Sequence, residues 1–414
     1  MRDKLTKLEK DWILYDVGNS AFILISATIV PIFFKNIATD AGISNAMSTA
    51  YWSYTLSIST LILAVLGPIL GRMADEKGRK KYFFLFCLAV GVIGCAVLGL
   101  INHWLAFLLV FLIAKSGYSG SLIFYDAMLT DVTTNNRSDR VSASGYAWGY
   151  IGSCIPFILC LALILKGDKV GIDASLGTIV SFMLIALWWI LCTIPLLRNY
   201  KQVYYREKLE RHSFKTIVSG FKRSIEKVKQ NRAIWTFMLA YFFYIDGVFT
   251  IIEMATSYGK DVGIGDTDLL LALLLTQIIA FPFALLFGYL SKKIKTRKLI
   301  EFSIIGYILI VLFALQLDQA WEFWFLAVCV AVFQGGIQSL SRSYFSRLVP
   351  KENSNEFFGM FDIFGKGAAF TGTLLIGVVT QITGSTRIGV AALIVLLGIG
   401  FYFVKKMPKN AADL

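Results

Sequence analysis

The sequence has too few histidines, and too scattered a set of cysteines, to build a metal centre. Only two of its 414 residues are histidines, and its six cysteines all fall inside apolar segments without metal-type spacing. It also lacks the Gly-x-x-x-x-Gly-Lys-Ser/Thr phosphate loop and the Gly-x-Ser-x-Gly turn of serine hydrolases. These absences argue against an ATP-driven pump and against an enzyme, and we expect neither a metal nor a cofactor.

Charge is also scarce. Charged residues make up 16% of the chain, whereas soluble proteins average about 25%. Hydrophobic residues reach 57%, and they cluster into blocks of roughly 20, the length of a membrane-spanning helix. The sequence therefore predicts an all-α, multi-pass integral membrane protein. The twelve expected spans are 12–34, 51–70, 82–101, 104–129, 141–165, 175–197, 233–257, 268–290, 299–317, 321–345, 357–380 and 387–404.

The basic residues are distributed unevenly between the two sides of the predicted membrane. If the N-terminus is cytoplasmic, the cytoplasmic segments hold 32 of the 40 Lys and Arg residues. This asymmetry follows the positive-inside rule and predicts that both termini are cytoplasmic. The net charge of +13 is thus divided among short loops on one side of a bilayer, which argues against a nucleic-acid partner.

The pattern of spans divides the chain into two halves of six. We expect an N-terminal half at 1–197, a basic linker at 198–232 and a C-terminal half at 233–414. Within the linker, apolar residues from Phe214 to Val228 recur at helical spacing. This indicates an amphipathic helix on the inner leaflet, either a strap that joins the halves or a regulatory, lipid-sensing element.

Two short basic loops support the idea of repeated halves. Span 2 ends in GRMADEKGRKK (71–81) and span 8 in GYLSKKIKTRK (288–298). The first loop resembles the signature loop of the major facilitator superfamily, with Asp75 and Arg79 at its acidic and basic positions. The resemblance implies two pseudo-symmetric six-helix bundles. Glu76 stands where a basic residue is usual, and Lys292 replaces the acid in the second loop, so we expect a weakened second latch.

Four further stretches resemble one family within that superfamily, the vacuole effluxers. They are WILYDVGNSAF (12–22), AYFFYIDGVFTI (240–251), QGGIQSLSRSYFSRLVP (334–350) and EFFGMFDIFGKGAAFTG (356–372). The family includes the autophagy-related vacuolar amino-acid effluxer and many bacterial permeases. The resemblance implies transport of a neutral amino acid such as leucine. The short termini and the lack of long inserted loops favour a bacterial inner-membrane protein, which we expect to be a monomer.

Polar residues form stripes on the first and fourth span of each half, the helices that line the central cavity in the resembled fold. At 100° per residue, Asp246, Thr250, Glu253 and Ser257 share one face of span 7. The other stripes are Gln334, Gln338, Ser341 and Arg342 in span 10; Lys115, Ser119 and Asp126 in span 4; and Asp16, Asn19 and Ser20 in span 1. Because ionisable groups at depth must face water or each other, these stripes indicate a water-filled substrate path.

We divide the polar residues by depth into two predicted groups. Asp246 is a candidate proton carrier or a partner for a substrate ammonium, and Lys115 either binds a substrate carboxylate or neutralises a neighbouring acid. The remaining candidates for the substrate or proton site are Glu253, Gln334, Gln338, Tyr244 and Asn19.

The second group lies nearer the cytoplasmic end. Asp16, Asp126 and Arg342 are expected to form charge pairs that close this end, as a gate or as structural support. Asp362 and Lys366 are spaced as an i, i+4 pair, which either holds span 11 together or contributes a gate or a substrate contact. Asp75 and Arg79 of the signature loop complete the group.

We therefore expect a secondary transporter that works by alternating access, with a neutral amino acid as substrate and with protons as an open question. A transporter of a sugar, nucleoside, lipid or drug would share the fold. A non-transporting receptor or scaffold is the alternative from another class, and neutralising Asp246 would leave its function unchanged.

Overall fold

The chain is seen in a computed structural model that describes residues 4–43, 45–166, 171, 173–207, 225–226, 228–261 and 263–408. Helices account for nearly all of these residues, and no strand occurs among them. A lone β-bridge joins Glu76 to Arg206. The prediction of an all-α protein is confirmed.

Helices lie at all twelve predicted positions. The first half contains α1 (Lys7–Ala27), α2 (Ile29–Asp40), α3 (Asn45–Ala74), α4 (Lys80–Leu98), α5 (Trp104–Val132), α6 (Asn135–Lys166) and α7 (Ala174–Asn199). The second half contains α9 (Arg232–Asp261), α10 (Asp266–Leu290), α11 (Thr296–Ala314), α12 (Ala320–Leu348), α13 (Ser354–Thr383), α14 (Thr386–Ala391) and α15 (Leu393–Lys406), with the short 3-10 turn η2 (Lys351–Asn353) before α13.

The first span is one predicted segment but two helices. It begins with a capping box, in which Thr6 accepts the amide of Glu9 and the Glu9 carboxylate accepts the amide of Thr6. It is interrupted at Thr28, between α1 and α2. Pro31 explains the break, because its ring clashes with the carbonyl four residues earlier, at Ala27, where α1 ends.

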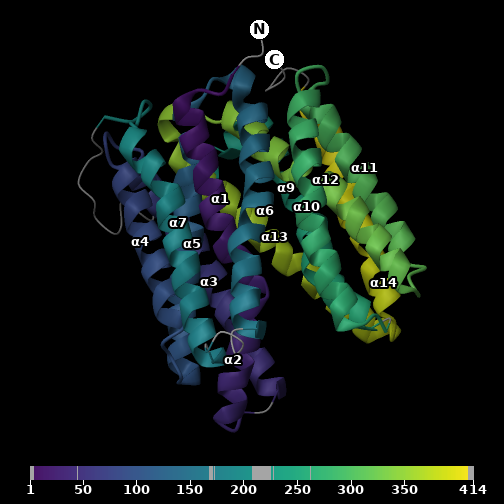
Figure 1. Cartoon of the computed structure of the whole chain (residues 1–414). Coiled ribbons are helices and arrows are strands. Elements are labelled where there is room, and N and C mark those ends of the chain that lie inside the picture. Colours follow the sequence, from purple (N-terminus) through teal and green to yellow (C-terminus); the bar gives the residue numbers. More distant parts are fainter. Residues whose placement is uncertain are drawn as a thin grey trace.

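Two apolar cores divide the helices into two bundles. One core runs from Trp12 to Tyr200 and the other mainly from Val228 to Met407. The bundles meet where α3 and α5 pack on α13, and where α6 packs on α10 and α12. Both chain termini lie at the same end of the molecule, at the top of Figure 1, and the bundles diverge toward the opposite end. We call these ends the terminal side and the far side.

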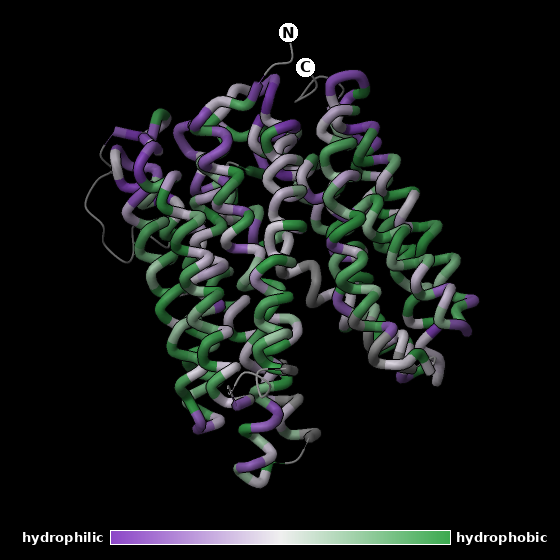
Figure 2. Tube along the Cα trace, in the orientation of Figure 1, coloured by the Kyte–Doolittle hydropathy of each residue, from purple (hydrophilic) through white to green (hydrophobic). Residues whose placement is uncertain are grey.

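The outer surfaces of the helices suit a bilayer. Ten helical segments are long and apolar enough to cross a membrane, within the part of the chain that the structure describes. Two further helices, α11 and α13, complete the twelve; α11 carries Arg297, Lys298 and Glu301 within its first six residues. Figure 2 shows hydrophobic residues along the helices and hydrophilic ones gathered at the ends, above all on the terminal side. The chain is therefore a multi-pass membrane protein.

The boundaries of the three predicted segments stay predictions. Residues 208–224 and 227 lie outside the described part of the chain. The amphipathic helix expected in the linker falls mostly on these residues.

Gly117 illustrates how closely helices pack within a bundle. A Cβ atom at this position of α5 would lie 2.5 Å from the amide nitrogen of Gly91 in α4. We predict that Gly117→Ala lowers the stability of the protein by about 1–3 kcal/mol, because the backbones must separate. Thermal unfolding in detergent measures the effect. The control is Gly398→Ala in α15, where a Cβ meets nothing within 4 Å; equal melting temperatures for both variants would contradict this account.

Candidate substrate path and gate

Asp246 is fully buried in α9, where it contacts α13. Its Oδ1 accepts the backbone amide of Gly372 at 2.8 Å and the hydroxyl of Thr250 at 3.3 Å. A side chain at position 372 would collide with this carboxylate, since a Cβ there would lie 2.4 Å from Oδ1. Asp246 is thus solvated by its own bundle in this conformation and does not line the space between the bundles. Its Oδ2 is buried without a hydrogen-bond partner among the described residues.

Glu253 and Lys115 bring opposite charges toward each other from different bundles. Glu253, on α9, is exposed, whereas Lys115, on α5, is half-buried. The two side chains interact electrostatically. The Lys115 ammonium also lies over the ring of Tyr118, 5.3 Å from its centroid. These charges can meet the two ends of a zwitterion held between the bundles. The remaining stripe residue of α9, Ser257, has a side chain outside the described part.

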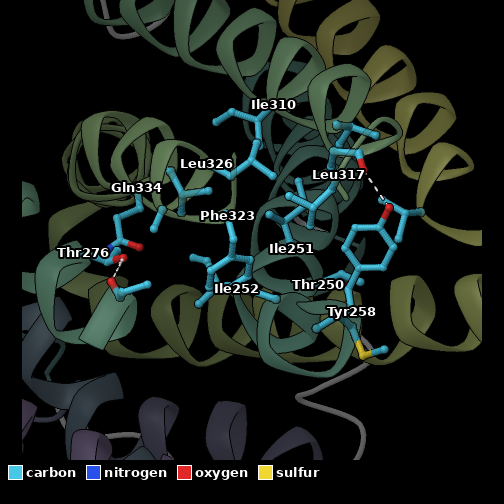
Figure 3. A pocket seen from close by; sticks show the side chains of 18 of the residues that line it. Thr250, Ile251, Ile252, Tyr258, Thr276, Ile310, Leu317, Phe323, Leu326 and Gln334 are labelled. Atoms are coloured by element: carbon cyan, nitrogen blue, oxygen red, sulfur yellow. Dashed lines mark hydrogen bonds between the residues drawn. The ribbon is translucent and has the colours of Figure 1, made fainter. Parts of the chain in front are cut away.

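The two glutamines of α12 differ in their surroundings. Gln334 is buried in the wall of a cavity of about 100 Å³ inside the second bundle, whereas Gln338 is half-buried. Figure 3 shows Gln334 beside Thr276 at one end of this cavity, with Ile310, Phe323 and other apolar side chains along the rest. Gln334 therefore faces the interior of one bundle and not the space between the two.

Tyr244 and Asn19 make hydrogen bonds within their own bundles. The Tyr244 hydroxyl shares a hydrogen bond of 2.6 Å with the hydroxyl of Ser341, which ties α9 to α12. The amide of Asn19 donates to the carbonyl of Tyr15 and to Asp16 Oδ1 at 3.1 and 3.2 Å. Both side chains are buried, so in this conformation they orient neighbouring groups.

Arg342 reaches from α12 into the first bundle. Its guanidinium donates to Asp126 Oδ1 at 3.0 Å and to Asp16 Oδ2 at 3.3 Å, and only 3% of the side chain is exposed. Ser142, on α6, accepts two more hydrogen bonds, through its hydroxyl at 2.9 Å and its carbonyl at 3.0 Å. The structure thus brings the three predicted charges together. Their role as a gate stays a prediction.

Asp75 caps a helix of the opposite bundle. Its Oδ1 accepts the backbone amide and the side-chain amide of Asn355 at 2.9 and 2.7 Å, and its Oδ2 accepts the amide of Glu356 at 3.1 Å. Two of these donors are free backbone N–H groups of the first turn of α13, where the helix dipole also favours an anion, and the third is the Asn355 side chain. Burial nevertheless raises the pKa of Asp75 to about 7, opposed by Lys80, by the Asn355 hydrogen bonds and by Arg206.

The other predicted charges of the terminal side are less connected. Arg79 pairs with Glu76 at 2.9 Å, and this ion pair lies within a single loop of the first bundle. Asp362 is half-buried and interacts electrostatically with Asp126. The side chain of Lys366 lies outside the described residues, so the predicted Asp362–Lys366 pair stays a prediction.

The second basic loop contacts an acidic residue of the first bundle. Asp139, near the start of α6, accepts the hydroxyl of Thr296 at 2.6 Å and a guanidinium N–H of Arg347 at 2.7 Å. Asp139 thus supplies an acid to the second basic loop, in which Lys292 occupies the position that Asp75 has in the first loop. Sequence reasoning missed Asp139 because its only local signal is an acid at the start of a span.

A buried lysine was also missed. Lys80 has no exposed side-chain surface; it pairs with Asp131 of its own bundle at 2.7 Å and donates to Ser354 of the opposite bundle at 3.1 Å. Arg206, after α7, pairs with Glu356. The basic run of the first loop, to which Lys80 belongs, could have pointed to this residue. The sequence around Arg206 gives no indication that Glu356 is its partner. Together these contacts join the bundles on the terminal side.

Comparison with known sequences identifies relatives along the whole chain. The sequence model of the family described as vacuole effluxer Atg22 like matches residues 6–412. The chain is 44% identical over 420 residues to YxiO, an uncharacterised MFS-type transporter of Bacillus subtilis, covering 100% of this chain and 97% of YxiO. It is 25% identical over 283 residues to autophagy-related protein 22-1 of Aspergillus niger, covering 63% of this chain and 45% of that longer protein.

The fold of this chain resembles that of solved transporter structures. The human organic anion transporter MFSD10 superimposes with a TM-score of 0.75 at 12% identity, covering 96% of this chain and 98% of that chain. The fucose:proton symporter of E. coli gives a TM-score of 0.71 at 16% identity, covering 97% and 98%. The predicted major facilitator fold, with two six-helix bundles, is confirmed.

The capping of α13 by Asp75 leads to a prediction. In Asp75→Ala the first turn of α13 loses three acceptor contacts, and caps of this kind contribute about 0.5–2 kcal/mol. Hydrogen–deuterium exchange of residues 354–358 should therefore accelerate by about 2- to 30-fold. Lys292→Ala, at the corresponding exposed position of the second loop, is the control and should leave this exchange unchanged. Unaltered exchange in Asp75→Ala would show that the cap does not hold α13.

Proposed function

Because the chain belongs to the Atg22-like vacuole effluxer family of major facilitator transporters, we propose that it carries a neutral amino acid by alternating access, driven by protons. The observation that carries the substrate class is the electrostatic interaction between Lys115 and Glu253, which lie on opposite bundles. A zwitterion satisfies both groups at once, its carboxylate at the lysine and its ammonium at the glutamate. An uncharged solute would leave two opposite charges to be desolvated without new partners.

Proton coupling is assigned to Asp246. A fully ionised carboxylate with one buried oxygen that has no partner among the described residues is costly, whereas a neutral carboxyl group is much less so. Asp246 also lies two helical turns from Glu253 on the same helix, so its protonation can be felt at the substrate position. The carboxyl would carry its proton while the bundles are joined on the terminal side and release it in the opposite conformation.

We assign the terminal side to the cytoplasm of a bacterial cell, with the protein in the inner membrane as a monomer. The excess of Lys and Arg in the terminal-side segments supports this orientation. In that orientation, the contacts of Arg342, Asp75 and Asp139 close the cytoplasmic side, and the substrate path is open toward the outside.

Uptake of radiolabelled leucine into proteoliposomes, with and without an inward proton gradient, tests the proposal. Uptake that rises with the gradient supports both substrate and coupling. Exchange that is independent of the gradient retains the substrate and removes the proton. Absence of uptake by folded protein overturns the amino-acid assignment.

The role of Asp246 gives a sharper prediction. In Asp246→Asn, one oxygen still accepts from Gly372 and Thr250, so the fold should persist, but no proton can be carried. Gradient-driven leucine accumulation should fall to the level of protein-free liposomes, while the yield of folded protein stays normal. Asp318→Asn, at an exposed far-side position paired with Arg387, is the matched control and should transport normally. Accumulation against the gradient by Asp246→Asn at the normal rate would exclude this carboxyl as the carrier.

A further inference from the structure

The guanidinium of Arg342 occupies an aromatic cage formed by Trp12, Tyr125 and Tyr146. Its central carbon lies 4.7, 5.5 and 4.3 Å from the three ring centroids. Rings within about 6 Å of a cation attract it through their negative faces. The acid pair, Asp16 and Asp126, completes the enclosure. The arrangement is a fully formed receptor for a flat cation.

Every part of this receptor belongs to the first bundle, whereas the cation belongs to the second. The cage and the acid pair lie on α1, α5 and α6, and Arg342 lies on α12.

The cage is also held together without the arginine. Trp12 stacks on Tyr125 with ring centroids 4.4 Å apart, and its indole N–H donates to the Tyr125 carbonyl at 3.0 Å. Tyr15 packs against Tyr125 from the other direction, at 4.5 Å. Separating the bundles would therefore withdraw the guanidinium and leave Trp12 and Tyr125 stacked in place.

Once Arg342 is withdrawn, none of the described residues that hydrogen-bond to Asp16 and Asp126 supplies a cation. Removing one partner from a buried charge cluster is strongly unfavourable, so another cation is favoured in its place. We propose that the aromatic cage and the acid pair form a binding site for the guanidinium or ammonium group of a small solute when the terminal side is open. Arg342 is then a tethered competitor for this site.

This inference rests on the proposed alternating access, because the site empties only when the bundles part. A solute that binds only the open conformation must shift the equilibrium toward it. The same cation would thus promote opening of the terminal side, and the return of Arg342 would expel it.

Truncation of the competitor tests the site directly. In purified Arg342→Ala the cage is vacant, and millimolar methylguanidinium should raise the melting temperature saturably, by about 2–4 °C. N-methylurea, which has nearly the same shape and no charge, should have no effect. Arg347→Ala is the matched control, since Arg347 also pairs with an acid across the bundles, Asp139, and lies over the ring of Tyr344. The triple combination of Arg342→Ala with Asp16→Asn and Asp126→Asn should lose the response.

The intact chain provides a second measurement, which also serves if Arg342→Ala does not fold. Spin labels at Lys77→Cys and Lys292→Cys, two exposed terminal-side positions on different bundles, report their separation. Methylguanidinium, but not N-methylurea, should increase the population with the longer distance.

The outcomes separate this inference from the proposed function. A distance distribution unchanged by methylguanidinium, or an equal melting shift with N-methylurea, overturns the cation site even if leucine is transported. A specific response to methylguanidinium without leucine transport retains the cation site and removes the proposed substrate.

Discussion

The burial of one positive charge at the junction of the bundles governs much of this structure. Arg342 is nearly inaccessible, and moving such a charge out of water without partners costs several kcal/mol. Its partners lie on α1, α5 and α6, so the charge is satisfied only when α12 stands against the first bundle. The contacts of Asp75 and Asp139 follow from that approach, because each reaches across the same side. Arg342, Asp75 and Asp139 thus all make contacts between the bundles on the same side of the molecule.

Away from the terminal side, charged groups of the two bundles also interact. Glu253 and Lys115 lie on different bundles and interact electrostatically. Asp246, deeper in the same helix, is satisfied by its own bundle. In the proposed function, charge between the bundles serves the substrate and charge within a bundle serves the proton.

The sequence was sufficient to predict the helices, the fold and the stripe that brings Arg342 to the acids, because lipid exposure imposes long apolar segments and isolates polar faces. It could not predict the partner of Asp246, since the backbone amide of Gly372 becomes available only through the packing of α13 on α9. Gln334 was assigned to the path from helical periodicity, but periodicity does not distinguish a face toward the other bundle from a face toward a cavity within one bundle. The role of Asp139 could not be predicted, because it depends on the packing of α6 against the second basic loop.

Access to Glu253 from the two sides of the membrane shows on which side the substrate path is open. A Glu253→Cys variant, with the six native cysteines replaced, is exposed to a membrane-impermeant thiol reagent in right-side-out and inside-out vesicles. The account predicts rapid modification from the far side and protection from the terminal side, where Arg342 joins the bundles. Modification from the terminal side alone, or from neither side, would contradict a substrate path that is open at the far side and closed at the terminal side.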